Sequence, residues 1–272
     1  MVQVFWAEEG GLPANDRGLA YGDGLFETIL MQGARGTLVA QHLERLVRDA
    51  EKLGIAVTDA DIKHVYARAA SHYGRSRPGT AWVLKLIVTR GAGGRGYHPD
   101  PDMSPNLLVS ANAAPPGVSS EGVRVDYSRI PLTVNPVFAG IKSLNRLEQV
   151  MAARELAGDV FEVLQSDRDG HLVEGTRTNL LLNTGQGWVT PPRDSLAVAG
   201  VMRQWVMDRL RSLGETVVER PLIRQDIESP NIRGFYLLNS VLGVVAVRNL
   251  DGRDLPVDKG LATICDPLET LE

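Results

Sequence analysis

The sequence predicts an α+β chain, with helices and strands mixed in its first half and short strands dominating its second. Apolar residues recur at helical spacing over 41–53 and 59–73, and glycines end both segments. Strand-like segments over 80–90 and 106–113 follow these helices. We therefore expect an N-terminal α/β domain and a β-rich C-terminal domain.

The second half is expected to consist mainly of short strands joined by tight turns. Strands are expected over four segments: 123–130, 161–167, 171–175 and 179–184. Two helices interrupt them. One is expected over 143–157 with Ser143 as its N-cap, and the other over 200–213. The apolar face expected for the second helix comprises Met202, Trp205, Val206, Leu210 and Leu213.

The stretch over 114–122 is the best candidate for a linker. It holds two prolines, two glycines and two serines between periodic segments. The expected division is therefore an N-terminal domain over 1–113, a linker over 114–122 and a C-terminal domain over 123–272.

Composition narrows the function classes. The chain has 272 residues, 43% of them hydrophobic and 23% charged, which is typical of globular proteins and argues against disorder. Its net charge is −4, whereas nucleic-acid binders and polybasic membrane proteins are normally basic. The one cysteine, Cys265, excludes an internal disulfide and a Cys-rich zinc site.

Neither a signal peptide nor a membrane span is expected. The first residues, MVQVFWAEEGG, lack a basic segment followed by an apolar one, and no apolar run reaches about 18 residues. We expect a cytoplasmic protein.

Familiar hydrolase and metal motifs are missing from the sequence. Neither GxSxG nor HExxH occurs, and the five histidines show no metal-ligand spacing, so no metal site is expected. The glycine-rich loop GAGGRGY over 91–97 lacks the GK[ST] of a P-loop and does not fit GxGxxG. It reads as a flexible active-site loop that carries Arg95 and Tyr97, or as an ordinary exposed loop.

Three charged residues are candidates for chemistry. Lys142 lies between an apolar segment and a helix start, where burial would lower its pKa and leave an amine able to form a Schiff base. Glu174 lies between two apolar strands, and Arg45 lies in HLERL. Each also has a plainer interpretation: a solvated lysine at a helix end, an edge-strand carboxylate and a polar-face arginine.

Taken together, the segments resemble the fold-type IV pyridoxal-phosphate enzymes. That family includes branched-chain and D-amino-acid aminotransferases and aminodeoxychorismate lyases. The matching segments, in family order, are DRGLAYGDGLFETI (16–29), HLERL (42–46), VTRGAGGRGY (88–97), AGIKSLNRLEQV (139–150), VEGTRTNLLL (173–182), GVMRQ (200–204) and LLNSVLGVVAV (237–247). The resemblance implies an N-terminal α/β sandwich domain, a C-terminal β-rich pseudo-barrel domain that carries the Schiff-base lysine, and pyridoxal 5′-phosphate as cofactor.

The resemblance also implies roles for individual residues. Lys142 matches the Schiff-base lysine, Arg45 the arginine on the cofactor phosphate and Glu174 the carboxylate facing the pyridine nitrogen. Further matches are the Val201 and Met202 backbone N–H groups at a helix start, which favour an anion, and the polar pair Asn239 and Ser240 near the same phosphate.

The substrate pocket separates the members of this family. Arg95 and Tyr97 match loop positions that bind the substrate carboxylate in D-amino-acid aminotransferases, where the loop reaches in from the other subunit. Those relatives carry histidine where this chain has Tyr97 and tyrosine where it has Phe26, which disfavours a D-amino-acid substrate. We hypothesise that Tyr97 donates a proton or hydrogen bond to the leaving group, and that Thr28 either contacts substrate or is structural.

Within the family, RGAGGRGY and NPVFAGIKSLNRLEQV look most like the lyases. The resemblance then implies a homodimeric lyase that converts 4-amino-4-deoxychorismate to 4-aminobenzoate and pyruvate in folate biosynthesis. The alternative is an aminotransferase acting on D-amino or branched-chain amino acids. A cofactor-binding protein without catalysis would be expected to lack Lys142 or Glu174, and both are present.

Overall fold

The computed structural model describes residues 2–93 and 96–272, and the chain divides into two units. Unit 1 comprises residues 1–114, 142–145 and 268–272, and unit 2 comprises residues 115–141 and 146–267. The boundary at residue 114 lies in the expected linker. Lys142, which the sequence placed in the C-terminal domain, packs with unit 1 instead.

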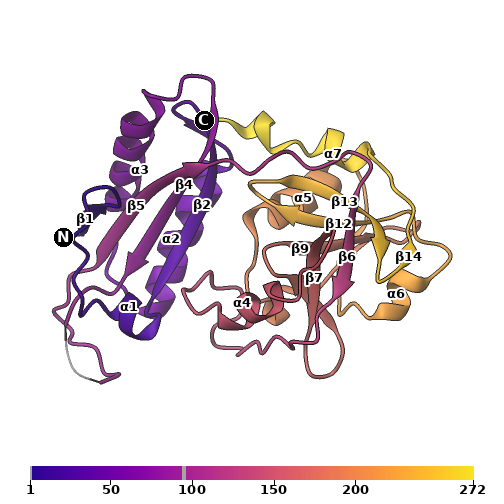
Figure 1. The fold of residues 1–272 in the computed structure, drawn as a ribbon, viewed down its shortest axis with the longest axis horizontal. Helices are drawn as coiled ribbons and strands as arrows, with labels where there is room; N and C mark the ends of the chain where they lie inside the picture. The colour runs from indigo at the N-terminus through magenta and orange to yellow at the C-terminus, as the bar shows by residue number, and fades with distance from the viewer. Residues whose placement is uncertain (1, 94–95) are drawn as a thin grey trace. The chain divides into compact units, whose positions relative to one another are not determined.

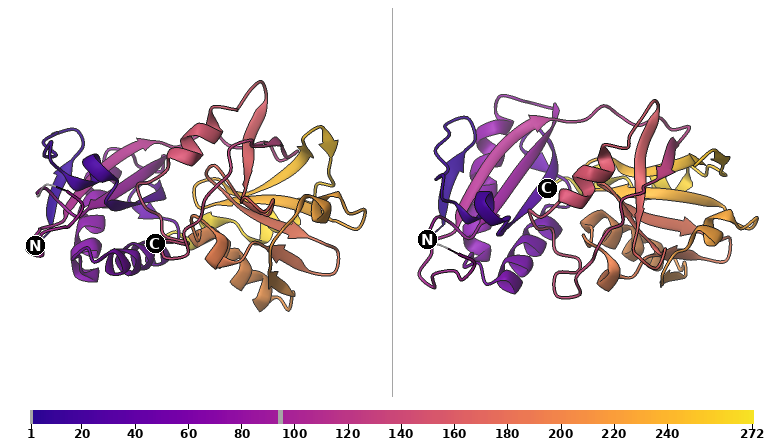
Figure 2. Two further views of the ribbon diagram at one scale, coloured as in Figure 1. Left: turned by 90° about the horizontal axis from the view of Figure 1, so that it is seen from below. Right: turned by 60° about the horizontal axis from the view of Figure 1, so that its bottom comes forward.

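Unit 1 is a five-stranded sheet with helices on one face (Figure 1). Its elements are β1 (Gln3–Trp6), α1 (Arg17–Tyr21), β2 (Gly24–Gln32), β3 (Arg35–Gly36), α2 (Val39–Leu53), α3 (Asp59–Gly74), β4 (Ala81–Thr89) and β5 (Asn106–Ala113). The strand order is β1-β5-β4-β2-β3, with β1 parallel to β5 and the other neighbours antiparallel. The two views of Figure 2 show α2 and α3 together on one side of this sheet.

Alternation along β2 decides which side chains meet the helices. Leu25, Glu27 and Ile29 are buried, whereas Phe26 and Thr28 between them are only half-buried. Glu27 contacts α2, so its side of the strand is the helix-covered face. Phe26 and Thr28 therefore lie on the opposite face, which we call the open face.

Unit 2 is built on a nine-stranded sheet with short helices. Its strands are β6 (Val123–Tyr127), β7 (Val160–Ser166), β8 (Leu172–Gly175), β9 (Asn179–Asn183), β10 (Trp188–Thr190), β11 (Val217–Glu219), β12 (Gly234–Asn239), β13 (Gly243–Leu250) and β14 (Arg253–Asp254). Its helices are α4 (Leu147–Ala153), α5 (Val201–Ser212), α6 (Arg224–Glu228) and α7 (Gly260–Ile264). The order is β11-β10-β9-β12-β13-β6-β7-β8, with β14 beside β13. The predicted α+β class and the β-rich character of the second part are confirmed.

The core of unit 2 is a hydrophobic cluster that includes side chains of these strands. Phe235 and Leu237 of β12 are fully buried within it, as are Leu180 and Leu182 of β9. Each completely buried side chain of this size stabilises the fold by about 1.5–3 kcal/mol relative to an exposed one. Burial of this cluster therefore stabilises the central strands β9 and β12.

The helix expected over 143–157 is shorter than predicted. It begins at Leu147 and ends at Ala153, and Ser143 does not cap it. Residues 142–145 instead run antiparallel beside β2, where Leu144 N–H donates to Gly24 O, Phe26 N–H donates to Lys142 O and Ser143 bridges Leu25. These sheet-type bonds are favoured over an earlier helix start because they satisfy backbone groups that a first helical turn leaves unpaired.

The apolar face predicted for α5 is partly wrong. Leu213 lies just beyond the helix and is 52% exposed, whereas Met207 and Arg203 are buried. Arg203 was not predicted to be buried because its partners, Thr190 Oγ1, Pro191 O and Glu219, come from other segments.

No helix in the described part of the chain is both long enough and apolar enough to cross a membrane.

Candidate active site

Lys142 is held at the edge of the unit 1 sheet. Its backbone is fixed by the bond to Phe26 N–H and by a longer contact, 3.4 Å, between its own N–H and Asp49 Oδ2. Its Nζ lies 4.2 Å from the centre of the Phe26 ring. The structure thus brings together Lys142 and Phe26, two residues that the sequence assigned to cofactor and substrate.

Asp49 was not singled out from the sequence. It lies one helical turn beyond Arg45 on α2 and is 2% exposed. Burial raises the pKa of its carboxyl group, against the opposing charge of Arg48. No local pattern could have placed it near Lys142, because the two residues are 93 positions apart.

Arg45 is buried in an ion-pair cluster on the helix-covered face of β2. Its Nε and Nη2 donate to the two carboxylate oxygens of Glu27 at 2.7 and 2.6 Å, and His42 Nδ1 lies 2.6 Å from Glu27 Oε2. Glu27 thus occupies the Nε–Nη2 edge of the guanidinium. The sequence offered Arg45 as a bidentate phosphate ligand but did not foresee that Glu27 occupies this edge.

Opposite charges set the protonation of this cluster. Burial alone would raise the pKa of Glu27, but the charge of Arg45 and the hydrogen bonds from Arg45 and His42 outweigh it and lower that pKa to about 2. Burial lowers the pKa of His42, so we assign the imidazole as neutral. Its Nδ1–H then donates a hydrogen bond to Glu27. His42 Nε2 is then a buried acceptor, and it has no hydrogen-bond partner within the described chain.

Glu174 and the start of α5 share one loop of unit 2. Glu174 on β8 is buried, and its Oε2 accepts a hydrogen bond from Val198 N–H at 3.1 Å. Asn179 on β9 holds the same loop by donating to Val198 O and accepting from Gly200 N–H. The short segment 198–200 thus connects the residue that binds the Glu174 carboxylate to the N-terminus of α5.

The start of α5 fits an anion. Its N-cap is Gly200, which offers no side-chain acceptor to the Val201 and Met202 N–H groups. A Cβ at residue 200 would stand 2.1 Å from Asn179 Oδ1, so only glycine fits there. These residues, with Glu174, fit the phosphate and pyridine ends of pyridoxal phosphate.

The side chain of Asn239, predicted to lie near the cofactor phosphate, forms hydrogen bonds with the backbone. Its Nδ2 donates to Arg177 O at 2.7 Å, and its Oδ1 accepts from Val241 and Leu242 N–H. The side chain therefore shapes the turn after β12. Ser240 follows it in the same turn and is half-buried.

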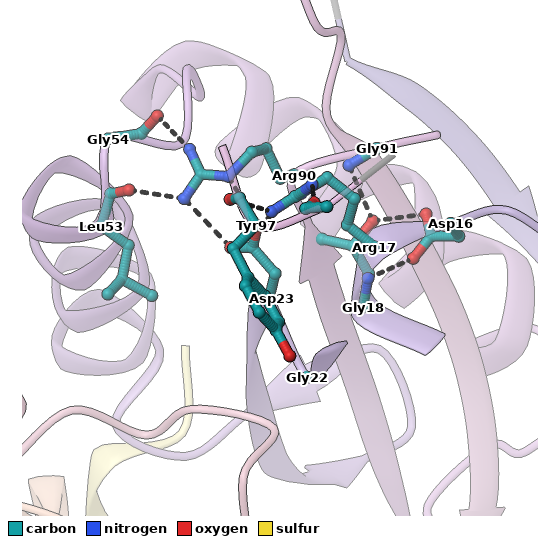
Figure 3. Close-up of polar contacts among 12 residues, drawn as sticks. Asp16, Arg17, Gly18, Gly22, Asp23, Leu53, Gly54, Arg90, Gly91 and Tyr97 are labelled. Atoms are coloured by element: carbon teal, nitrogen blue, oxygen red, sulfur yellow. Dashed lines mark hydrogen bonds and ion pairs between the residues drawn. The ribbon is translucent and has the colours of Figure 1, made fainter. Parts of the chain in front are cut away.

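A polar network fixes the start and the end of the glycine-rich loop (Figure 3). Arg17 is 3% exposed and donates to Gly96 O at 2.9 Å, to Tyr97 O at 2.8 Å and to Asp23. Arg90 forms a bidentate pair with Asp23 and also donates to Leu53 O and Gly54 O. The sequence quoted these residues only as parts of motifs and gave them no role.

Tyr97 itself is 84% exposed and packs on Tyr21 of α1, with ring centres 5.4 Å apart. Arg95, the other residue predicted in this loop, lies outside the described residues. Thr28 lies on the open face of β2, opposite Lys85 of β4.

A cluster of Asp167, Asp169 and His171 in the β7–β8 turn, of which Asp169 is exposed and the other two are half-buried, was not expected from histidine spacing. Their ligand atoms lie within 4.8 Å of one another. Hydrogen bonds from the Asp169 and His171 N–H groups to Asp167 Oδ1, together with a 3.0 Å contact of His171 Nδ1, account for the grouping as a turn.

Comparison with known proteins identifies the family. The model of the family described as amino-transferase class IV matches residues 24–250. The chain belongs to the class IV aminotransferase family. The resemblance inferred from the sequence is thereby confirmed, and so is the cofactor, pyridoxal phosphate.

Relatives in this family differ in activity. The chain is 29% identical over 262 residues to an aminodeoxychorismate lyase of Vibrio harveyi, covering 94% of each chain. It is 30% identical over 246 residues to a putative branched-chain-amino-acid aminotransferase of Methanocaldococcus jannaschii, covering 88% of this chain and 82% of that one. The crystal structure of 4-amino-4-deoxychorismate lyase from Pseudomonas aeruginosa matches with a TM-score of 0.87 at 34% identity, covering 94% of this chain and 93% of that one.

Proposed function

We propose that this class IV enzyme is an aminodeoxychorismate lyase, which converts 4-amino-4-deoxychorismate to 4-aminobenzoate and pyruvate and so serves folate synthesis. The observation that carries the proposal is the open face of β2, where Phe26 rather than a polar residue lies against Lys142. An apolar ring beside the amine suits a flat six-membered substrate ring. The likeness to lyases of two bacteria supports the same choice.

Each end of the cofactor has residues suited to hold it. Lys142 would bind it covalently, Glu174 would keep its pyridine nitrogen protonated, and the N–H groups of Val201 and Met202 would bind its phosphate with Arg45. When bound, pyridoxal phosphate supplies a conjugated ring that accepts the electron pair left when a proton leaves the carbon bearing nitrogen.

Two side chains then act on the substrate. Lys142 Nζ takes the proton from the carbon that bears the substrate nitrogen. Tyr97 donates a hydrogen bond to the enolpyruvyl oxygen as pyruvate leaves, reaching the site of a second subunit in a homodimer. The exposure of Tyr97 and the clamping of its backbone by Arg17 support this assignment.

The test is an assay of two reactions on one preparation. The cofactor-loaded protein is given 4-amino-4-deoxychorismate, and 4-aminobenzoate is followed by fluorescence and pyruvate by a coupled assay. D-alanine and leucine are each given with 2-oxoglutarate in parallel. Equal yields of 4-aminobenzoate and pyruvate are expected, whereas rapid transamination without 4-aminobenzoate would refute the proposal.

A further inference from the structure

A buried carboxyl group of unit 2 has no part in the proposed function. Glu162 on β7 is completely buried, and three donors converge on its two oxygens. Thr176 Oγ1 and Arg177 N–H donate to Oε1 at 2.9 and 2.7 Å, and Thr178 Oγ1 donates to Oε2 at 2.7 Å. All three donors belong to one turn, residues 176–178, which joins β8 to β9.

The backbone of this turn packs directly on the carboxyl group. A Cβ at residue 175 would stand 2.6 Å from Glu162 Cδ, so a larger residue there would displace the carboxyl group. Gly175 N–H in turn donates to Thr178 O at 2.8 Å. Burial raises the pKa of Glu162, and the hydrogen bonds from the turn oppose that rise. Since a buried carboxyl group is costly unless its oxygens are hydrogen-bonded, the turn and Glu162 hold each other in place.

The same turn joins the two residues that organise the start of α5. Glu174 precedes the turn on β8 and accepts a hydrogen bond from Val198 N–H. Asn179 follows the turn on β9 and binds Val198 O and Gly200 N–H. A shift of the turn would therefore move the Glu174 carboxylate and the N-terminus of α5 together.

We infer that Glu162 is a positioning residue for the cofactor, because it fixes the turn that places Glu174 and the start of α5. Groups that contact a ligand act well only when their neighbours hold them within about 0.5 Å of the productive geometry. The inference rests on the cofactor roles proposed for Glu174 and for the Val201 and Met202 N–H groups. It is independent of the choice between lyase and aminotransferase, since both reactions use the same cofactor.

The experiment compares Glu162→Gln with the matched control Glu155→Gln. Glu155 also collects three hydrogen bonds within unit 2, from Ser128 Oγ, Arg129 N–H and Arg129 Nε, but none comes from the turn over 176–178. Affinity for pyridoxal 5′-phosphate is measured by absorbance titration of protein freed of cofactor. Glu162→Gln should weaken it at least about 10-fold, and Glu155→Gln should stay within about 2-fold of the parent. An unchanged affinity in Glu162→Gln would overturn the inference.

A second pair of variants tests the same contact from the side of the turn. Thr178→Val removes one donor to Glu162 with little change in side-chain shape, whereas Thr178→Ser keeps the hydroxyl group. Thr178→Val should weaken cofactor affinity by about 3- to 10-fold, and Thr178→Ser should recover part of the loss. Thermal unfolding without cofactor sets a temperature at which each variant is folded. A Thr178→Val protein that binds the cofactor as the parent does would overturn the inference, even where Glu162→Gln does not fold.

The absorbance of the bound cofactor separates positioning from stability alone. At saturating cofactor, the pH dependence of this absorbance should change in Glu162→Gln in the same direction as in Glu174→Gln, because both changes weaken the charge that faces the pyridine nitrogen. Glu155→Gln should keep the parent profile. A change in Glu174→Gln alone would overturn the inference and leave the role of Glu174 standing, and a change in neither would overturn both. A parent that binds the cofactor but forms no 4-aminobenzoate would refute the proposed function alone.

Discussion

The two faces of strand β2 treat charge in opposite ways. On the helix-covered face, Glu27 is 1% exposed and meets Arg45 and His42 at 2.6–2.7 Å. On the open face, the Phe26 ring contacts the nitrogens of Lys85 and Lys142. In the described part of the chain, no carboxylate oxygen lies within 4.0 Å of Lys85 Nζ. Adjacent residues of one strand thus take part in a neutralised cluster and in a cationic surface.

The difference teaches which charges hold the fold and which serve the chemistry. A buried ion pair is costly to break because its loss leaves one charge unpaired, so Glu27 should matter mainly for stability. Under the proposed function, Lys142 on the open face takes the substrate proton, so this face should matter mainly for function.

The largest effect is expected at Lys142, which joins the open face to the chemistry. Under the proposed function, Lys142→Ala removes both the covalent link to the cofactor and the group that takes the proton. Turnover should fall by at least about 10³-fold, and the visible absorbance of the protein-bound cofactor should shift. Thermal unfolding without cofactor should change little, and a collapse of the fold would contradict the division between the faces.

Removing the carboxylate on the helix-covered face should cost stability. Glu27→Gln leaves Arg45 buried without its counter-ion, and the free energy of unfolding should fall by about 3–5 kcal/mol in urea titrations. Glu44→Gln, on the exposed side of the same helix α2, is the matched control and should stay within about 0.5 kcal/mol of the parent. Equal stability of Glu27→Gln and Glu44→Gln would show that the cluster does not hold the fold.

Acid should weaken the contribution of the same cluster to stability. The pKa of Glu27 is lowered from 4.5 to about 2, so its contribution is complete above pH 4.5 and is lost as the pH falls from 4.5 toward 2. The difference is worth about 3 kcal/mol, from the 1.36 kcal/mol of each pKa unit. Unfolding at pH 6 and at pH 3 should therefore differ less in Glu27→Gln than in the parent. Identical acid dependence in the two proteins would contradict this.

The smallest effect is expected at the ring between the lysines. Phe26→Leu keeps an apolar side chain but removes the π-face that Lys85 and Lys142 share. A cation–π contact of about 0.5–1 kcal/mol predicts a rise in KM of about 2- to 5-fold. Steady-state kinetics with 4-amino-4-deoxychorismate measures it. An unchanged KM would show that the π-face of the ring does not contribute to binding.

Local patterns predicted elements well where local forces decide them. The helix over 41–53 was expected from its apolar spacing and Gly54, and α2 covers Val39–Leu53 with Gly54 as its left-handed C-cap. The helix expected from Ser143 failed because backbone groups of β2, more than a hundred residues earlier, claim residues 142–145. Such pairing has no signature in the neighbouring sequence.

The site shows the same limit. Lys142, Arg45 and Glu174 were proposed as site residues because each matches a family segment. The contact of Lys85 with the Phe26 ring was not predicted because the two residues lie on different strands, which only the register of β2 with β4 joins. The pairing of Arg45 with Glu27 was not predicted for the same reason: the two residues lie on different elements.

The contrast between the two faces is tested most directly by measuring the unfolding temperature and the turnover together on Lys142→Ala and Glu27→Gln. For Lys142→Ala without cofactor, the account predicts an unfolding temperature within about 2 °C of the parent, and for the cofactor-loaded protein a turnover lowered by at least about 10³-fold. For Glu27→Gln it predicts the larger loss of stability, about 3–5 kcal/mol. An unfolding temperature of Lys142→Ala lowered as far as that of Glu27→Gln, with turnover unchanged, would contradict it.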